Sequence, residues 1–560
     1  MKLSRRIIGG MCGAALLLGA FAGCTKYENG SEKVYSYDEA ITELNAFNKE
    51  IKTDTKQLRL DIYDDDTTNK ALADIKTFPI TVQGDGDINL EIASPSELSG
   101  DAPDDWINVI ARRFNDARQT VDGRTVSVTV RKIASGETLT YISEGDYRPQ
   151  LYIPSSFAWG EMLKAKGIGV EKLADRILGN TAGILMEKAT YDTFMEKYQT
   201  CTLDKVIEAS LAGDLTFAYT NPYTSATGLN AIASTLYAFD NQNPLSEQAQ
   251  QKLLDYQKQS PPVAYTTGVL VNQASKGISK SMVMEEQAYI NKPELKNYVY
   301  TPFGIRHDHP LYTFDYVSAE ERQAAELFKA FCLSDSAQQL GKEKGFGKHD
   351  EYQSQQTGLD GAGYLAAQNI WKEAKDGGQP IIAVFVADVS GSMDGTPIQS
   401  LKESLLATKS YIGSDNYIGL VSYATKVHVD LPINKFDAEQ KAYFSGAVKA
   451  LTVEDATATY DAVLVAMKMM IDKKEEVPNA KMMLFVLSDG DQNRGYSLDR
   501  IAPIVGGLKI PVYTIGYNIE ADSRPTKELT RLSNINEAAM IKADSDGLVN
   551  QLRNLFNTQL

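Results

Sequence analysis

Short apolar runs that end in polar turns alternate with amphipathic segments through the last third of the chain. The apolar runs have the length and continuity of strands buried on both faces of a parallel sheet. Strands are predicted over residues 381–387, 416–424, 482–488 and 510–517, with an edge strand over 427–433. Apolar residues at helical spacing predict helices over 397–411, 437–450, 459–473, 497–506 and 545–557. The alternation predicts a doubly wound α/β domain over residues 379–560.

A second α/β pattern occupies residues 76–350. A strand over 88–93 precedes a helix whose apolar face carries Trp106, Ile110 and Phe114. Further strands are predicted over residues 125–131, 150–153 and 215–219, and another helix begins near Leu229. Because strands and helices alternate, we expect a largely parallel sheet whose loops gather at its carboxyl edge.

Two polar stretches flank this domain. Residues 25–75 contain one short predicted helix over 37–51, and we interpret them as a linker with peripheral structure. Residues 351–378 are rich in glycine and glutamine. They are predicted to be a linker that permits either a rigid or an independent arrangement of the domains.

The N-terminus has the pattern of an export signal. A basic start precedes an apolar run over residues 7–22, and the run stops at Phe21-Ala22-Gly23-Cys24. This ending resembles a bacterial lipobox, although Phe21 stands where leucine is usual. The resemblance implies that residues 1–24 form a lipoprotein signal and that Cys24 is lipidated. A plain transmembrane anchor is the alternative, but the apolar run is short for a membrane span.

Composition narrows the class of protein. At 560 residues, with 43% hydrophobic and 23% charged side chains, the chain is expected to fold into two or three domains. The formal net charge of −16 argues against nucleic-acid binding, which needs a basic surface. Cys201 and Cys332 lie beyond the signal. Export permits a disulfide between them, and two buried free thiols are the equal alternative.

Candidate metal chemistry begins where the predicted strand 381–387 gives way to a turn. Asp388, Ser390 and Ser392 stand there at alternate positions, so one carboxylate and two hydroxyls can point oxygen atoms into one small space. Hard divalent cations prefer such all-oxygen surroundings. The three residues are therefore candidate ligands.

The Asp-x-Ser-x-Ser motif resembles the metal-ion-dependent adhesion site (MIDAS) of von Willebrand factor A (vWA) domains. Thr457, in Thr-Ala-Thr-Tyr-Asp-Ala, and Asp489, in Leu-Phe-Val-Leu-Ser-Asp-Gly, follow in the order of that family's second and third loops. The resemblance implies that Ser390, Ser392 and Thr457 bind a cation directly or nearly so. Asp388 and Asp489 would bind it directly or through water. Mg²⁺ is expected, with Mn²⁺ and Ca²⁺ as alternatives, and an acidic side chain of a partner protein replaces one exchangeable water.

Hydroxyl side chains mark the loops of the first domain, at the starts of helices. They are Ser94, Ser96, Ser155, Ser156, Thr224, Ser225 and Thr227. Backbone N–H groups and the helix dipole favour an anion at such positions, and the hydroxyls add donors. These residues predict an anion-binding cleft between two lobes. Serine and threonine are also preferred N-caps, a role that each fulfils without a ligand.

These loops resemble, in their order, type II solute-binding proteins of transport systems, particularly those for oxyanions such as sulfate or molybdate. The matching segments are residues 93–98, 153–156, 221–228 and 325–347. The resemblance implies an α/β fold in which a two-lobed type II periplasmic-binding-protein-like domain is followed by the doubly wound (Rossmann-like) vWA domain. It also implies a small anionic solute.

Together these features predict a lipid-anchored binding protein on the extracytoplasmic face of a bacterial membrane, which engages an aspartate or glutamate of a partner protein through its MIDAS. The alternative is an oxyanion-type receptor lipoprotein of an ABC transport system with an accessory vWA domain. The sequence contains no evident phosphate-binding loop or nucleophile–base pair, so we do not expect an enzyme. We interpret His307-Asp308-His309 as a solvated loop.

Overall fold

The computed structural model describes most of the chain from residue 35 onward. The described residues are 35–61, 72, 74–100, 102, 105–259, 261–264, 267–275, 279–375, 379–409, 412–490, 492–517, 519–520, 522–536, 538, 540–543, 552 and 555. The predicted signal 1–24, with Cys24, lies outside them, as does the predicted helix 545–557 apart from Leu552 and Leu555.

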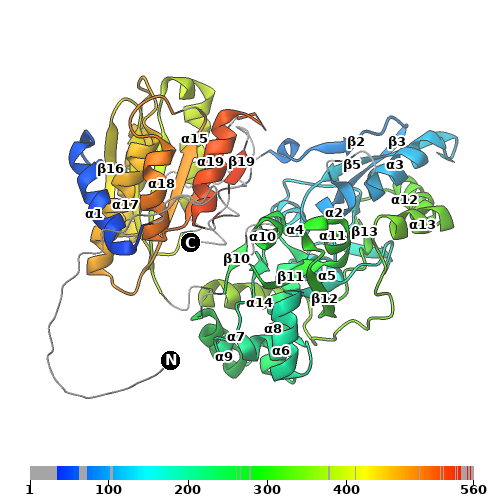
Figure 1. Cartoon of the computed structure of the whole chain (residues 1–560). Helices are drawn as coiled ribbons and strands as arrows, with labels where there is room; N and C mark the ends of the chain where they lie inside the picture. Colours follow the sequence, from blue (N-terminus) through cyan, green and yellow to red (C-terminus); the bar gives the residue numbers. More distant parts are fainter. Residues whose placement is uncertain are drawn as a thin grey trace, which may run out of the picture.

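A seven-stranded sheet forms the centre of the C-terminal domain (Figure 1). Its order is β1-β16-β15-β14-β17-β18-β19, and every neighbouring pair is parallel except β15 with β16. The strands are β1 (Thr53–Thr55), β14 (Ile381–Asp388), β15 (Tyr417–Tyr423), β16 (Val427–Lys435), β17 (Lys481–Ser488), β18 (Val512–Tyr517) and β19 (Met540–Ala543). All five strands predicted in this domain are therefore present.

Helices cover both faces of this sheet and bury β14 along its whole length. They are α1 (Tyr37–Glu50), α15 (Thr396–Thr408), α16 (Ala438–Ala450), α17 (Thr459–Glu476), α18 (Leu498–Leu508) and α19 (Arg524–Ile535). Successive side chains of a strand point to opposite faces. Phe385 accordingly packs in the core under α15 and α16, and its neighbours Val384 and Val386 pack in the opposite core with α1, α17 and α18.

Residues 25–75, interpreted as a linker with peripheral structure, contribute two elements to this sheet domain, and the helix predicted over 37–51 is one of them. Helix α1 begins with a capping box formed by Ser36 and Glu39, and its fully buried Leu44 packs in the core shared with α17 and α18. Strand β1 pairs with β16, so β16 is not the edge strand that we predicted. The two-lobed domain is consequently inserted, in chain order, between β1 and β14.

The first lobe contains a mixed sheet in the order β2-β5-β3-β6-β13-β7, with β4 paired to β5. Its strands are β2 (Ile80–Val82), β3 (Ile88–Ser94), β4 (Thr120–Val121), β5 (Arg124–Lys132), β6 (Leu151–Tyr152), β7 (Val170–Ala174) and β13 (Leu311–Phe314). Its helices are α2 (Ser96–Ser99), α3 (Trp106–Asp116), α4 (Ser135–Glu144), α5 (Phe157–Ala165), α12 (Ala319–Cys332) and α13 (Asp335–Glu343). Strands β5, β3 and β6 are parallel, as predicted, whereas β2 and β13 are antiparallel to their neighbours.

The second lobe departs further from the predicted parallel sheet. An antiparallel group, β11-β8-β12, lies beside the short parallel pair β9 and β10. These strands are β8 (Ala182–Glu187), β9 (Tyr219–Thr220), β10 (Val263–Ala264), β11 (Ser281–Glu285) and β12 (Tyr298–Phe303). The helices are α6 (Lys188–Tyr198), α7 (Leu203–Leu211), α8 (Ala226–Phe239), α9 (Glu247–Gln257), α10 (Thr267–Ser275) and α11 (Glu286–Asn291). The chain crosses between the lobes through residues 175–181 and 304–310.

Helix α14 (Gly361–Ala374) lies within residues 351–378, the segment that we predicted to be a linker. It contacts α5 of the first lobe and α8 and α9 of the second. Trp371 is fully buried and its indole N–H donates to the hydroxyl of Tyr219, at 2.8 Å. This segment is therefore part of the two-lobed domain.

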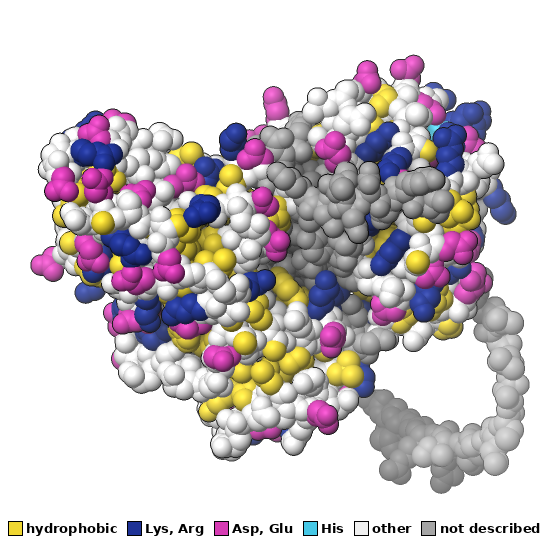
Figure 2. Space-filling view, turned by 180° about the vertical axis from the view of Figure 1, so that it is seen from behind, with side chains coloured by type: hydrophobic (Ala, Val, Ile, Leu, Met, Phe, Trp, Pro, Cys, Tyr) yellow, Lys and Arg dark blue, Asp and Glu magenta, His cyan; other side chains and the backbone are white. Residues whose placement is uncertain are grey.

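Cys201 and Cys332 are both free and buried, and they belong to separate hydrophobic clusters. No helix in the described part of the chain combines the length and hydropathy needed to span a membrane. Acidic and basic side chains are interspersed over the face that Figure 2 presents, so the net negative charge is not gathered into one patch there.

Replacing Leu44 with alanine is expected to destabilise the C-terminal domain by about 2–5 kcal/mol, because a buried leucine leaves a cavity. The three tryptophans, Trp106, Trp159 and Trp371, all lie in the two-lobed domain. The urea-unfolding transition of this domain, followed by far-UV circular dichroism, should therefore shift to a lower urea concentration. The transition followed by tryptophan fluorescence should stay in place. The exposed Lys49, replaced with alanine, is the control. An unchanged circular dichroism transition would contradict the role of α1 in this core.

Candidate functional site

The candidate metal residues lie where two adjacent parallel strands end. Strand β14 ends at Asp388, and β17 ends at Ser488, immediately before Asp489. The two strands pair in register up to Ala387 and Leu487, so their carboxyl ends meet at one edge of the sheet. In doubly wound folds this edge is where ligands bind.

Asp388 is fully buried and is held by neutral donors. Its Oδ1 accepts the backbone N–H of Ser390 at 2.9 Å. Its Oδ2 accepts the hydroxyls of Tyr423 at 3.0 Å and Ser488 at 2.9 Å. Burial raises the pKa of Asp388, although these hydrogen bonds oppose the shift. The position of the carboxylate is thus fixed, but its charge has no compensating positive group among these donors.

Three further candidates form a chain of hydrogen bonds leading outward from this carboxylate. The hydroxyls of Ser390 and Ser392 are 3.1 Å apart, and the hydroxyl of Ser392 donates to Asp489 Oδ1 at 2.9 Å. Ser390 is buried, Asp489 half-buried and Ser392 exposed, so this chain reaches the surface. Burial, together with the charge of Asp388, raises the pKa of Asp489 to about 6.

Thr457 lies in a loop that crosses the same edge of the sheet. The N–H of Glu454 donates to the carbonyl of Val389 at 2.8 Å, and the N–H of Ala458 donates to the carbonyl of Ala424 at 3.1 Å. Thr457 is buried, and its N–H donates to Asn493 Oδ1 at 2.9 Å. The hydrogen bonds recorded for the described residues join the other four candidates to one another, whereas Thr457 shares only their edge of the sheet.

This donor set suits a hard divalent cation. It offers two carboxylates and three hydroxyls. Burial raises the pKa of both carboxylates, and the charge of Asp388 raises that of Asp489 further, an effect that a bound cation would relieve. The described residues contain no cluster of three or more His, Cys, Asp or Glu side chains that could hold a metal.

Neighbouring aspartates have structural roles. Asp461 Oδ1 accepts the N–H of Tyr496 at 2.8 Å and ties the loop after β17 to helix α17. Asp394 is exposed and accepts the N–H of Gly395 at 3.0 Å. Asp491 lies outside the described residues.

A cleft of about 750 Å³ separates the lobes of the first domain. Five of the seven predicted hydroxyl residues line it, namely Ser96, Ser155, Thr224, Ser225 and Thr227. The other two, Ser94 and Ser156, are buried and do not belong to its lining. Ser225 also accepts the N–H of Gly228 at 3.5 Å, so it caps α8 as the alternative reading of these residues anticipated.

The acidic side of this cleft was not predicted from the sequence. Glu97 and Glu285 line it, and each contacts a fully buried histidine: Glu97 Oε1 lies 3.4 Å from His309 Nε2, and Glu285 Oε1 lies 2.9 Å from His307 Nδ1. The expectation that His307-Asp308-His309 forms a solvated loop is wrong. The alternation of the three residues was a usable signal, because both histidines are fully buried and Asp308 between them is partly exposed.

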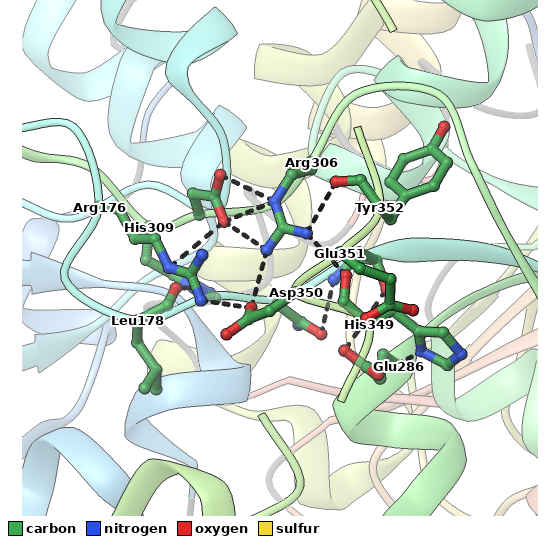
Figure 3. Close-up of polar contacts among 12 residues, drawn as sticks. Arg176, Leu178, Glu286, Arg306, His309, His349, Asp350, Glu351 and Tyr352 are labelled. Atoms are coloured by element: carbon green, nitrogen blue, oxygen red, sulfur yellow. Dashed lines mark hydrogen bonds and ion pairs between the residues drawn. The ribbon is translucent and has the colours of Figure 1, made fainter. Parts of the chain in front are cut away.

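The opposite side of the same segment is fixed by an ion-pair network (Figure 3). Arg306, whose side chain is 9% exposed, pairs with Asp308 and Asp350 at 2.9 and 3.2 Å. Its guanidinium also donates to the main-chain oxygens of His349 and Tyr352, at 2.8 and 3.2 Å. The crossover carrying both histidines is thereby attached to the segment that follows α13.

Ser155, Glu97 and His309 do not form a nucleophilic triad. The hydroxyl of Ser155 donates to Glu97, and Glu97 in turn contacts His309, so the carboxylate lies between the serine and the histidine. Nucleophilic catalysis needs the histidine in the central position, where it removes the proton from the hydroxyl.

Comparison with known families assigns each domain. Residues 383–557 match the model of the von Willebrand factor type A domain, and residues 98–347 match that of a bacterial extracellular solute-binding protein. The chain therefore fuses a vWA domain to a solute-binding domain, and both families are binding or adhesion types rather than enzymes.

Among curated proteins, mouse (Mus musculus) inter-alpha-trypsin inhibitor heavy chain H3 is 29% identical over 185 residues, 30% of this chain. The chain spans only 20% of that relative's length. A solved von Willebrand factor type A structure from Catenulispora acidiphila is 20% identical, covers 32% of this chain and 42% of its own, and has a TM-score of 0.29. Iron-bound HitA from Pseudomonas aeruginosa is 17% identical, covers 52% of this chain and 99% of its own, and has a TM-score of 0.38.

Replacing Ser488 with alanine is expected to lower the free energy of unfolding of the vWA domain by about 1–3 kcal/mol in metal-free buffer, because it removes a donor from the buried Asp388 carboxylate. Urea unfolding followed by circular dichroism measures the change. Ser497 is the matched control, because it is exposed and its side chain makes no cap hydrogen bond at α18. Equal effects of the two substitutions would contradict the role assigned to Ser488.

Proposed function

We propose that the protein is an extracytoplasmic binding protein whose vWA domain captures an acidic side chain of a partner protein through a divalent cation. Asp388, Ser390, Ser392, Thr457 and Asp489 would hold the cation, with Mg²⁺ as the first choice and Mn²⁺ or Ca²⁺ as alternatives. The observation that supports this proposal best is the hydrogen-bonded chain from the buried Asp388 through Ser390 and Ser392 to Asp489. It leads from a buried charge to the surface.

The roles of these side chains follow from their positions. Tyr423 and Ser488 hold Asp388, which supplies negative charge at the base of the site. The exposed Ser392 and half-buried Asp489 stand at the rim, where a partner carboxylate can approach. A bound divalent cation supplies the positive charge that attracts this carboxylate. Mg²⁺ keeps exchangeable waters, and a carboxylate oxygen can take the place of one.

Location is part of the same proposal. The match to a bacterial extracellular solute-binding family favours an extracytoplasmic site of action. Lipidation of Cys24 would anchor the protein to a bacterial membrane, which the residues around Cys24 support. Nucleic acid is not an expected partner at a net charge of −16.

The interlobe cleft supports a second function, a solute receptor that serves a transport system. Its volume of about 750 Å³ lies within the usual range for small-molecule sites, and polar groups from both lobes line it. In this reading the vWA domain brings the receptor to a partner. The two functions are compatible because their sites lie in different domains.

Magnesium is expected to stabilise the vWA domain by about 2.7 kcal/mol at a free concentration one hundred times the dissociation constant. Asp388→Asn should abolish this increment. The same substitution should raise stability in metal-free buffer, because it removes a buried charge. Unfolding with and without Mg²⁺, followed by circular dichroism, tests both effects, with the exposed Asp394→Asn as control. An increment that survives in Asp388→Asn would place the cation elsewhere.

Partner capture should depend on the cation and on the rim hydroxyl. We expect immobilised protein, starting at Thr25, to retain an envelope protein in Mg²⁺, to release it in EDTA, and to lose it in Ser392→Ala. Asp394→Asn should retain the partner normally. Capture that persists after chelation would exclude the adhesion mechanism, even if Mg²⁺ binds.

A further inference from the structure

Two glutamates reach the cleft from opposite lobes and meet one crossover segment. Glu97 belongs to helix α2 of the first lobe, and Glu285 is the last residue of β11 in the second. Between them, residues 304–310 carry His309, which contacts Glu97, and His307, which contacts Glu285. The charge of Glu97 acts on Glu285, so the two carboxylates share one electrostatic environment.

His309 neutralises Glu97. Its Nδ1 lies 2.9 Å from the carbonyl oxygen of Leu178, which can only accept, so Nδ1 carries a proton. Nε2 faces the Glu97 carboxylate, so a second proton there completes an imidazolium–carboxylate pair. Burial alone would lower the pKa of His309, but Glu97 outweighs it and raises that pKa. Conversely, burial would raise the pKa of Glu97, and His309 brings it below its usual range.

His307 does not neutralise Glu285 in the same way. The side-chain amide of Asn230 is oriented by Ile305, because its Oδ1 accepts the Ile305 N–H at 2.8 Å and its Nδ2 donates to the Ile305 carbonyl at 2.7 Å. The Nδ2 group, a donor, therefore faces His307 Nε2 at 3.5 Å. This leaves Nε2 as an acceptor and puts the single proton on Nδ1, which donates to Glu285.

Glu285 presents its carboxylate to the cleft and, among the described residues, forms no ion pair with a lysine or arginine. The residue is only 8% exposed, and no described residue donates a hydrogen bond to its second oxygen, Oε2. Burial, together with the charge of Glu97, raises its pKa. A buried carboxylate of this kind is costly without a positive partner. Since Glu285 lines the cleft, a solute can supply that partner.

We infer that the cleft binds a small organic cation, with a positively charged nitrogen group seated between Glu285 and Glu97. This inference rests on the proposed receptor function of the cleft. The hydroxyls of Ser225 and Thr227 offer acceptors to the same N–H groups. An oxyanion, the solute that the hydroxyl-rich loops first indicated, would instead be repelled by the carboxylate of Glu285. Because Glu285 and Glu97 come from different lobes, a shared cation favours lobe closure.

The remaining charges of the cleft define what else the solute can carry. Asp105, Lys292 and Lys344 also line it; Lys292 is exposed, and Asp105 and Lys344 are half-buried. A solute with a separate anionic group, such as an amino acid, is therefore compatible with the cleft. The cationic group is the part that Glu285 selects.

The test is isothermal titration of the chain starting at Thr25 with putrescine, choline and arginine, and in parallel with sulfate and molybdate. At least one cation is expected to bind saturably and to raise the midpoint of the tryptophan-fluorescence unfolding transition. Glu285→Gln should weaken that binding by at least about tenfold. Glu294→Gln, at an exposed position of the same lobe, should leave it unchanged. Glu97→Gln provides a second variant from the other lobe.

A measurement without any solute accompanies the titration. Because Glu285 is a buried carboxylate with no lysine or arginine partner among the described residues, Glu285→Gln should raise the tryptophan-reported midpoint of the empty protein, as substitutions at binding sites can do. A lowered midpoint would mean that Glu285 only supports His307, and it would overturn the inference. Binding of an oxyanion but of no cation would also overturn it while leaving the receptor function standing. Binding of neither class would overturn both.

Discussion

Carboxylates held in buried positions by neutral donors determine the chemistry of both domains. Asp388 accepts hydrogen bonds from one backbone N–H and two hydroxyls, and Glu285 accepts one from the imidazole of His307. An ionised carboxylate is stable in such a position only when something supplies opposite charge. In the functions that we propose, a cation supplies this charge at each site, and the donors determine where it lies. The two sites differ in their access to solvent. Asp388 is linked to the surface only through the hydroxyls of Ser390 and Ser392, whereas Glu285 lines a cleft directly.

The elements around Asp388 could be predicted because their signals are local. Strand β14 is a continuous apolar run, and its polar end follows directly in the sequence, so the position of the site at the strand terminus is visible without a structure. The position of Thr457 relative to the other candidates depends instead on the loop over residues 454–458. That loop is held by backbone hydrogen bonds to Val389 and Ala424, the residues that directly follow β14 and β15, and no sequence pattern encodes these bonds.

Residues 25–75 and 351–378 were interpreted wholly or partly as linkers, because no hydrophobic periodicity in their sequences indicates how β1 and α14 pack. Strand β1 is three exposed residues, and only its pairing with β16 makes it part of the sheet. Helix α14 begins at Gly361, where a β-carbon would lie 2.0 Å from the carbonyl oxygen of Glu161. This glycine permits close contact between α14 and α5 rather than flexibility. The acidic side of the cleft was missed for a similar reason, since Glu97 and Glu285 meet only through the crossover between the lobes.

The order of elements along the chain connects the two sites physically. Helix α14 contacts both lobes, and the chain leads from it into β14, the strand that ends at Asp388. The other connection leaves the vWA domain after β1, where His428 contacts both Asp54 and Glu454. Glu454 in turn is hydrogen-bonded to Val389, beside the candidate metal residues. Both covalent connections to the solute-binding domain therefore join the sheet near the candidate metal residues. One leads into β14, which ends at Asp388, and the other leaves β1, which is linked to Val389 through His428 and Glu454. A fusion of two independent modules at a single linker would not have this arrangement, because one end of the inserted domain would then be free of the sheet.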